Sequence, residues 1–498
     1  MSSMNVLMIA GEVQPYAKTG GLGEVMAALP KAVHRLGHDV RVYMPLYGTI
    51  SRKQFAFVPI GREMSLNVGD EISPIRFSAS ILSQEVPIYF LESEKYFPPD
   101  QSVIYDPKLG NLPYYAFNLS VFKLLETLDW IPDVIHIHDW HAGLIPNIIR
   151  YLPADSPYAK IATVETIHNS AYVAIADQWQ IPKEDQDTGD GLPPTDTRKV
   201  QYINFLKRGI ANADIVTTVS EQYAKELLVQ KTSHGLYDVL SPRARTFFGV
   251  RNGVDYTYWN PMFDEKLPVN YDIEIVHRKY DNKRALQHRL NLPIDETIPI
   301  IGMNSRITEQ KGFSLVEEIF AGLMKRHVQL VVVGAGQGAH TQFLTDKMRQ
   351  FPTQLAFRRG QEAVDELGTL VYAGSDIFLM PSLFEPSGLG QLVSLRYGTI
   401  PVVRRTGGLA DTIADYNGRN HTGNGFMFDE YTGPALLEAI DRSLNLWEQK
   451  DRWWDLMVHS MALSYSWEIP AKKYVRIYKA AIKEHQGLAW SIPKRWQK

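Results

Sequence analysis

Residues 18–25 read KTGGLGEV and follow closely on VLMIA, the apolar run of residues 6–10. This order predicts a strand, a glycine-rich turn and the start of a helix. Glycines let the backbone turn tightly and leave N–H groups uncovered, and the helix start adds partial positive charge. Lys18 adds a full charge beside them. The turn is therefore suited to hold a phosphate group, although many glycine turns after strands bind nothing.

A second turn of this type lies far along the chain, where Thr406, Gly407, Gly408 and Leu409 repeat the tetrapeptide TGGL. It again follows a strand-like run and precedes a helix-like segment. Two such turns in the two halves of the chain predict a ligand that both halves bind. The run GAGQG at residues 334–338 lacks the spacing of a dinucleotide fingerprint, and we interpret it as a strand-to-helix turn near a nucleotide.

Length and composition limit the possible functions. At 498 residues the chain is too long for one core and predicts two domains or more. Charged residues make up 21% of the chain and the net charge is -3, which gives no general attraction to nucleic acid or to acidic lipid. We therefore expect no nucleic-acid partner and no membrane partner, but a small molecule or a neutral polymer.

The chain has no cysteine, which excludes disulfides, thiolate metal sites and a cysteine nucleophile. No segment approaches the ~20 apolar residues of a membrane span. The first predicted strand begins almost at once and leaves no room for a signal or transit peptide, although a processed chain would look the same. The expected location is the cytoplasm.

Short β-type runs alternate with helix-like stretches, which predicts parallel sheets with right-handed crossovers. They form two series, residues 6–10, 40–44, 86–91, 134–138, 161–167 and 215–219, and then residues 298–303, 329–333, 355–357, 377–380 and 400–403. We predict an α/β chain of two Rossmann-like domains, residues 1–260 and 282–465, with a linker at 261–281. Aromatic residues at helical spacing within 466–498 predict a C-terminal helix that packs back on the first domain.

Polar residues follow a buried strand in HIHDWH, residues 136–141, where open α/β sheets bind their ligands. Three histidines this close could suggest a metal. Alternation along the strand sends His136 and His138 to one face and leaves His141 on the turn, so we favour hydrogen-bonding roles and no metal site. Asp139 is the better functional candidate.

His168 and Asn169 end the next strand of the same half. A lone histidine there is commonly a structural hydrogen-bonding group, but two polar strand ends side by side favour a site. Asn252 adds an amide side chain in the turn NGVD, which could equally be a simple turn.

In the second half Arg306 and Lys311 lie on one loop after a strand. A guanidinium fork and a point charge are typical of a diphosphate site, and a solvated basic pair is the alternative. Glu385 follows a later strand between two prolines and precedes a glycine turn at Gly388. Rigid placement suits this carboxylate for hydrogen bonds to hydroxyl groups.

Taken together, the motifs resemble one known family closely. The chain contains, in this order, KTGGLGEV, HIHDWHAG, TIHN, NGVDYTYWNP, SRITEQKGF, PSLFEPSGLGQL and RYGTIPVVRRTGGLADT. They look like those of the bacterial glycogen synthases and plant starch synthases that use ADP-glucose, and the resemblance covers nearly the whole chain. It implies a GT-B fold, with a cleft between an acceptor-side domain and a nucleotide-sugar domain. It also implies transfer of glucose from ADP-glucose to the non-reducing end of an α-1,4-glucan or maltooligosaccharide, with retention of configuration and without a cofactor.

The resemblance also implies roles for single residues. Lys18, Gly20 and Gly21 would bind the donor diphosphate, and Arg306 and Lys311 would bind the phosphate that leaves. Asp139, His168 and Asn252 would surround the transferred glucose, and Glu385 would bind its hydroxyls. The glycine turns would face the sugar and phosphates with Gly388, Leu389, Thr406, Gly407 and Gly408. The family lacks a protein nucleophile, and the departing phosphate would help to deprotonate the acceptor with the His168 carbonyl near the anomeric carbon.

The chain departs from the family pattern in several places. Ser387 replaces a cysteine, and Glu24 stands where aspartate is usual. The family's HNxxYQG becomes HNSAYVA at residues 168–174, in a loop expected on the acceptor side. Ala363 or Val364 replaces the aromatic residue that usually packs on adenine. These changes leave the donor base and the acceptor open.

Three alternatives follow. The first is a glucan synthase that uses UDP-glucose, and the second is a catalytically weak glucan-binding or priming protein of the same fold. The third is a glucan phosphorylase, which needs pyridoxal phosphate on a lysine, but no region of this sequence resembles that lysine site. The oligomeric state is not predicted.

Overall fold

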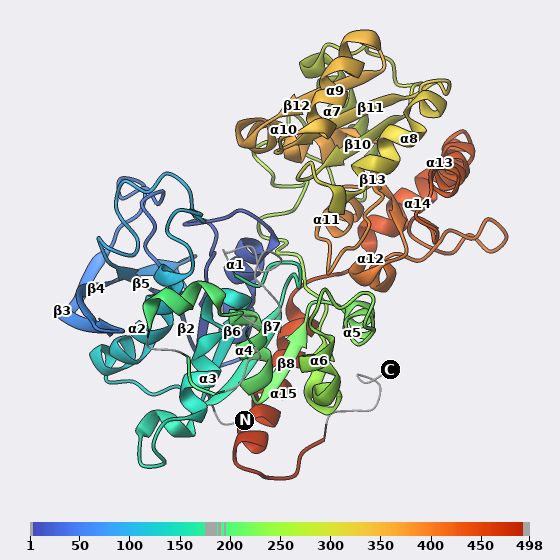
Figure 1. Cartoon of the computed structure of the whole chain (residues 1–498). Helices are drawn as coiled ribbons and strands as arrows, with labels where there is room; N and C mark the ends of the chain where they lie inside the picture. Colours follow the sequence, from blue (N-terminus) through green and yellow to red (C-terminus); the bar gives the residue numbers. More distant parts are fainter. Residues whose placement is uncertain (1–2, 175–186, 188–190, 194–195, 492–498) are drawn as a thin grey trace. The chain divides into compact units, whose positions relative to one another are not determined.

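The computed structural model describes residues 3–174, 187, 191–193 and 196–491 (Figure 1). The chain forms two compact units, each described by itself. Unit 1 consists of residues 1–253 and 467–498, and unit 2 of residues 254–466. The last part of the predicted C-terminal segment, residues 492–498, lies outside the described residues.

Unit 1 is built on a nine-stranded sheet with the strand order β3-β4-β5-β2-β1-β6-β7-β8-β9. The strands from β5 to β9 in this order are parallel, whereas β3 pairs antiparallel with β4 and β4 with β5. Their bounds are β1 Asn5–Ala10, β2 Asp39–Pro45, β3 Val58–Val68, β4 Glu71–Leu82, β5 Val86–Glu92, β6 Val134–His138, β7 Ala162–Ile167, β8 Ile215–Thr218 and β9 Phe247–Gly249. The central strands are apolar runs buried on both faces, as parallel strands under helices must be.

Among the described residues of unit 1, seven α-helices pack against this sheet or against one another. They are α1 Gly21–His34, α2 Leu112–Leu128, α3 Leu144–Arg150, α4 Phe205–Asn212, α5 Glu221–Leu227, α6 Tyr237–Leu240 and α15 Glu468–His485. The last of these, α15, comes from the C-terminal end of the chain and packs on β6, β7 and β8. Its buried Tyr478 lies with its hydroxyl 2.8 Å from Nδ1 of His136, so a strand-end histidine is fixed by this helix.

Unit 2 has a six-stranded parallel sheet with the order β12-β11-β10-β13-β14-β15. The strands are β10 Ile300–Asn304, β11 Gln329–Gly334, β12 Leu355–Arg359, β13 Ile377–Met380, β14 Ile400–Arg404 and β15 Phe426–Phe428. The helices are α7 Lys279–Leu290, α8 Phe313–Leu323, α9 Ala339–Gln350, α10 Gln361–Gly374, α11 Gly390–Arg396, α12 Gly407–Thr412, α13 Gly433–Trp447 and α14 Lys450–Ala462. The predicted α/β class with two Rossmann-like parallel sheets is confirmed.

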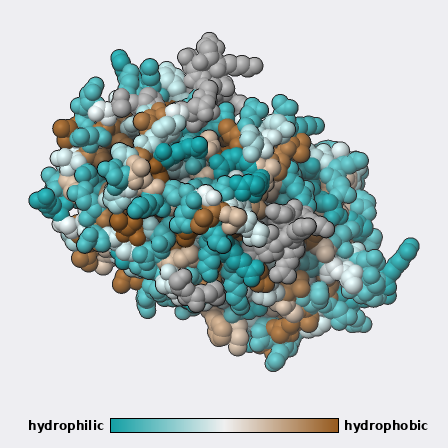
Figure 2. All heavy atoms as spheres, turned by 90° about the horizontal axis from the view of Figure 1, so that it is seen from below, coloured by the Kyte–Doolittle hydropathy of each residue, from teal (hydrophilic) through white to brown (hydrophobic). Residues whose placement is uncertain are grey.

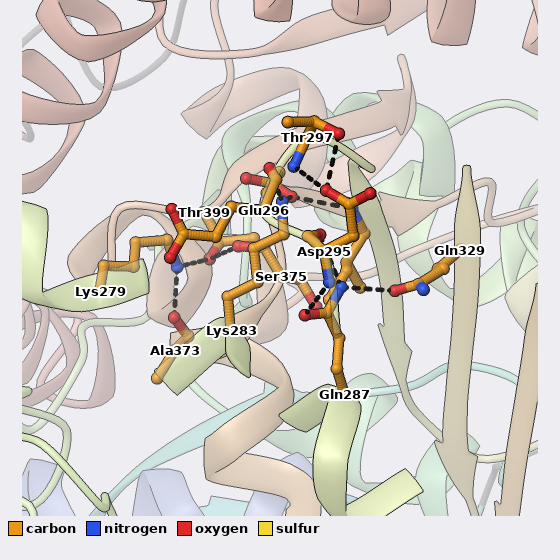
Figure 3. A network of polar contacts seen from close by, with 12 residues as sticks. Lys279, Lys283, Gln287, Asp295, Glu296, Thr297, Gln329, Ala373, Ser375 and Thr399 are labelled. Atoms are coloured by element: carbon orange, nitrogen blue, oxygen red, sulfur yellow. Dashed lines mark hydrogen bonds and ion pairs between the residues drawn. The ribbon is translucent and has the colours of Figure 1, made fainter. Parts of the chain in front are cut away.

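Residues 261–281, predicted as a linker, lie within unit 2. Tyr271 in this segment is 1% exposed, and its hydroxyl donates to the carbonyl of Tyr397 at 2.8 Å. The following helix, α7, carries two buried lysines (Figure 3). Lys279 donates to the carbonyl of Ala373 at 2.7 Å, in the last turn of α10, where helix carbonyls lack a partner of their own. Lys283 pairs with the buried Asp376 at 2.8 Å, so α7 is fastened to the sheet by charge as well as by packing.

In the part of the chain that the structure describes, no helix is both long enough and apolar enough to cross a bilayer. On the face drawn in Figure 2, hydrophobic residues are scattered among hydrophilic ones. Such scattering is ordinary for a protein surface in water.

Candidate functional site

Polar residues gather at the carboxyl ends of the strands in each unit, which is the edge where open α/β sheets bind ligands. In unit 1 they come from the loops after β1, β6 and β7. In unit 2 they come from the loops after β10, β13 and β14.

The glycine turn after β1 is held by Glu12, a residue that the sequence analysis missed. Its carboxylate, in a residue only 4% exposed, accepts the backbone N–H groups of Thr19 at 2.7 Å and Gly20 at 3.1 Å. It also accepts the hydroxyls of Thr19 at 2.5 Å and Tyr105 at 2.6 Å. Two of the turn's N–H groups are thus already satisfied inside the protein. Those of the first helical residues, from Gly21 on, have no acceptor within α1 and are the ones suited to an anion.

Lys18 lies beside this turn and pairs with Glu24 in the first turn of α1. The Nζ and Oε1 atoms are 2.6 Å apart, and the side chains are 38% and 21% exposed. A partly exposed pair of this kind contributes little to stability. The ammonium of Lys18 can therefore change partner when an anion arrives.

Asp139 directly follows β6 and has an unusual backbone. Its φ of 59° with ψ of -177° is a conformation found almost only in glycine. The carboxylate Oδ1 accepts the N–H groups of His168 at 2.6 Å and Asn169 at 3.3 Å, which begin the loop after β7. Burial raises the pKa of this carboxyl to about 8. The two predicted strand-end residues, Asp139 and His168, are thus brought together, and Oδ2 is the oxygen suited to a substrate hydroxyl.

The two histidines of β6 make separate hydrogen bonds to the neighbouring strand β7 and to the loop after it. His136 Nε2 lies 2.6 Å from the hydroxyl of Thr166, and His138 Nδ1 lies 2.9 Å from Nε2 of His168. Burial lowers the pKa of His168 to about 3, so its ring is neutral near neutral pH. His141 takes no part in these two hydrogen bonds, and its ring stacks on Tyr105 with ring centroids 5.2 Å apart.

In unit 2 the central contact is an ion pair between Lys311 and Glu385. Nζ and Oε2 are 2.6 Å apart, and the side chains are 17% and 6% exposed. The hydroxyl of Ser382 donates to the same Oε2 at 3.1 Å. A nearly buried carboxylate with two donors is held in one orientation, which suits hydrogen bonding to a sugar.

The loops that carry this pair lie directly against each other. The N–H of Leu383 donates to the carbonyl of Gln310 at 2.9 Å. Gly312 has a φ of 78°, and a Cβ there would lie 2.0 Å from the carbonyl oxygen of Pro381. Glycine is required at this position both by the backbone angle and by the close approach.

The second glycine turn packs on the Glu385 loop. The N–H of Gly408 donates to the carbonyl of Glu385 at 3.0 Å, and a Cβ on Gly408 would lie 2.0 Å from the carbonyl oxygen of Ser387. Gly407 has a φ of 43° and approaches Glu385 equally closely. The structure shows that this turn contacts and supports the backbone of Glu385. The predicted contact of Thr406, Gly407 and Gly408 with a donor stays a prediction.

The remaining predicted site residues lie on loops or turns that follow strands, or at the start of a helix. Arg306 is half-buried on the loop after β10, and Asn252 is 7% exposed in the turn after β9. Gly388 has a φ of 68°, and Leu389 precedes α11. Their roles toward a ligand stay predictions.

The residues considered for the donor base lie on α10. Ala363 and Val364 are half-buried in its first turn, directly after the carboxyl end of β12. Tyr372, in contrast, is 6% exposed and packs on Phe378 with ring centroids 4.9 Å apart. It is therefore a core residue of unit 2.

Comparison with known proteins relates both units to sugar transfer. Residues 5–242 match the family model described as starch synthase catalytic domain, and residues 286–455 match glycosyl transferases group 1. The glycogen synthase of Syntrophotalea carbinolica is 40% identical over 97% of this chain and 100% of its own length. Glycogen synthase 2 of Geobacter sulfurreducens is 38% identical over 97% of this chain and 100% of its own.

The same relation holds among solved structures. The catalytic domain of starch synthase IV from Arabidopsis thaliana, bound to ADP and acarbose, is similar with a TM-score of 0.85 and 26% identity. The match covers 97% of this chain and 100% of that one. Sucrose-phosphate synthase from Thermosynechococcus elongatus shares the fold, with a TM-score of 0.60 and 16% identity over 95% of this chain and 98% of that one.

Proposed function

The chain belongs to the glycogen and starch synthases, a family of glycosyltransferases with the GT-B fold, and we propose that its donor is ADP-glucose and its acceptor an α-1,4-glucan. In this proposal glucose is added to the non-reducing end with retention of configuration. The ADP and acarbose bound to the related starch synthase IV domain support a nucleotide sugar as donor and a glucan as acceptor. The cytoplasmic location stays a prediction, and the acceptor length is not part of the proposal.

The observation that carries the proposal is the Lys311–Glu385 pair at the carboxyl edge of the unit 2 sheet. When the bond from the anomeric carbon to the donor phosphate breaks, negative charge grows on the departing phosphate oxygen. Lys311, with Arg306 on the same loop and Lys18 on unit 1, supplies positive charge for it. Stabilisation of this kind is commonly the largest single contribution to catalysis.

Glu385 has a separate role in this proposal. Its carboxylate is fixed by Lys311 and Ser382, so its remaining capacity to accept hydrogen bonds points in a defined direction. We assign it to the hydroxyls of the transferred glucose, together with Asp139 and Asn252. An oriented sugar reaches the reactive geometry without further loss of freedom.

The acceptor proton goes to the donor in this scheme. The bond between the anomeric carbon and the phosphate oxygen breaks, the acceptor hydroxyl oxygen bonds to that carbon on the same face, and its proton passes to the departing phosphate. His168 contributes its carbonyl, since its N–H is taken by Asp139 and its ring is neutral. No protein nucleophile is needed.

The test is release of nucleoside diphosphate from ADP-glucose and from UDP-glucose, each with and without glycogen. Glycogen-dependent release from ADP-glucose, at least about tenfold faster than from UDP-glucose, is the expected result. Preference for UDP-glucose would show that the proposed donor is wrong, but the enzyme class would be unchanged. Absence of release from both donors would favour a glucan-binding or priming protein.

A further inference from the structure

Unit 1 contains a pocket at the opposite edge of its sheet from the candidate site. Its volume is about 430 Å³. Thr163 at the start of β7, Asp214 directly before β8 and Thr246 directly before β9 all line it. Because these strands are parallel, their amino ends lie at one edge and the site residues that follow their carboxyl ends lie at the other (Figure 1). The pocket is therefore separate from the candidate catalytic residues.

The pocket is lined by more positive than negative side chains. Arg150, Arg243, Arg245 and His485 face it together with two carboxylates, Asp214 and Glu484. Arg150 comes from the last turn of α3, the other arginines from the segment 241–246, and His485 from the last turn of α15. Three separate parts of unit 1 thus place cations around one space.

Both carboxylates already accept hydrogen bonds from other residues of unit 1. Asp214 Oδ2 accepts the N–H of Thr163 at 2.7 Å, and its Oδ1 lies 3.1 Å from Nδ1 of His485. Glu484 accepts from Arg245 at 2.5 Å and from the indole N–H of Trp490. These contacts hold the two carboxylates in the pocket wall. Two carboxylates do not neutralise all of the positive side chains that line the pocket.

Both ring nitrogens of His485 face acceptors, which favours its protonated form. Its Nε2 lies 2.9 Å from the carbonyl oxygen of Ala159, which can only accept, so this nitrogen bears a hydrogen. Its other nitrogen faces the Asp214 carboxylate, and that hydrogen bond raises the pKa of His485.

The arginines differ in how they are held. Arg243 is pinned by main-chain carbonyls, with Nη1 3.1 Å from the oxygen of Ala211 and Nη2 3.0 Å from that of Asp214. Arg150 is exposed and has no hydrogen bond or ion pair to any other residue that the structure describes. A rigid guanidinium beside one that can still adapt is an arrangement suited to an incoming anion.

We propose that this pocket binds a compact organic dianion, a phosphate monoester or a dicarboxylate. Four cations against two occupied carboxylates leave an excess of two positive charges for the ligand when His485 is protonated. The volume exceeds that of a bare phosphate and lies within the range of small-molecule sites, so an organic body belongs to the ligand. Binding joins α3, the segment 241–246 and the end of α15 through one molecule.

The experiment titrates the full chain with glycerol 3-phosphate and, separately, with succinate at constant ionic strength, by calorimetry. We expect saturable binding with a Kd of about 1 mM or below for at least one probe. Which probe binds distinguishes the phosphate source from the dicarboxylate source. Arg150→Gln and Arg245→Gln should each weaken binding about tenfold or more.

Two controls locate the binding. Arg76→Gln removes an arginine of unit 1 that is 65% exposed and paired with Glu63, which matches Arg245 at 66% and its pairing with Glu484. It should leave Kd within about twofold. Lys311→Met removes a cation of the candidate catalytic site and should also leave binding unchanged. Circular dichroism checks that each variant is folded.

Three outcomes would overturn the proposal. The first is the absence of saturable binding of both probes to the folded wild-type chain. The second is binding that is lost in Lys311→Met and kept in both pocket variants, because the anion would then occupy the catalytic site. The third is unchanged affinity in folded Arg150→Gln and Arg245→Gln chains.

Discussion

Lys311 pairs with the nearly buried carboxylate of Glu385, and we propose that it also binds the leaving phosphate. Lys311→Met keeps the length of the side chain and removes the charge. We expect kcat to fall by about 10²-fold or more, because the growing negative charge loses its nearest cation. Steady-state kinetics with ADP-glucose and glycogen measures this. Lys325→Met, at an exposed lysine of the same unit, is the control, and equal activity of the two variants would remove Lys311 from the mechanism.

Glu12 determines which N–H groups the first glycine turn can offer. Each carboxylate oxygen of Glu12 accepts from two of the four donors, so Glu12→Gln places an amide NH₂ against one of these two pairs and removes their acceptor. We expect a loss of about 1–3 kcal/mol in the free energy of unfolding and a higher KM for the donor. Tyr105→Phe, which removes only the hydroxyl contact, should raise KM much less. Equal KM values in both variants would mean that the turn does not contact the donor.

Asp139 makes stability depend on pH in a defined direction. Burial raises its pKa from 3.8 to about 8, so the folded chain keeps a proton that the unfolded chain releases. This contribution to stability is fully present below the unfolded pKa of 3.8 and decreases as pH rises. It is lost once pH exceeds the folded pKa of about 8, and the slope is at most about 1.4 kcal/mol per pH unit.

Asp139→Asn should flatten this dependence. Urea unfolding between about pH 5 and about pH 8 measures the slope, and the wild-type chain should lose more stability over that range than the variant. Asp70→Asn, at an exposed turn of unit 1, should keep the wild-type slope. A wild-type slope in Asp139→Asn would show that another group titrates.

At the scale of elements, the second glycine turn supports the loop that carries Glu385. Gly408→Ala brings a Cβ against the carbonyl of Ser387, and the loop has to move. We expect activity to fall about 10²-fold, because small displacements of substrate-positioning groups are costly. Gly418→Ala, where a Cβ meets nothing within 4 Å, is the matched control. Wild-type activity in folded Gly408→Ala would show that this turn is not needed to position Glu385.

Most of the parallel strands could be predicted because each of them is a short apolar run buried on both faces. The β3–β4 hairpin could not, because most of β3 is exposed and only Leu66 and Val68 along it are buried, so hydrophobic patterning is weak there. The strands β9 and β15 are three residues long, which is too short for a pattern.

The same reasoning explains what could be predicted of the site. Asp139 and His168 meet because β6 and β7 are neighbours, and Lys311 and Glu385 meet because β10 and β13 are neighbours. Neighbouring parallel strands bring their carboxyl ends to one edge, and the alternation of strands with helices along the chain predicts parallel sheets. Glu12 could not be found in this way, because its contacts depend on how the loop after β1 folds back on the turn.

At the scale of the whole molecule, each unit contributes its own group of fixed polar residues at a sheet edge. Unit 1 holds Asp139 and His168, and unit 2 holds Lys311 and Glu385. In the proposed function, these two groups bind the sugar and the leaving phosphate. The proposal therefore requires one glucosyl transfer for each nucleoside diphosphate released.

The most direct measurement follows ADP release and the length of a defined maltooligosaccharide in the same reaction with ADP-glucose. The proposed function predicts that one glucose is added at the non-reducing end, in a new α-1,4 bond, for each ADP released. It also predicts loss of both signals in Lys311→Met. ADP release without chain growth, or chain growth with inverted linkage, would contradict it.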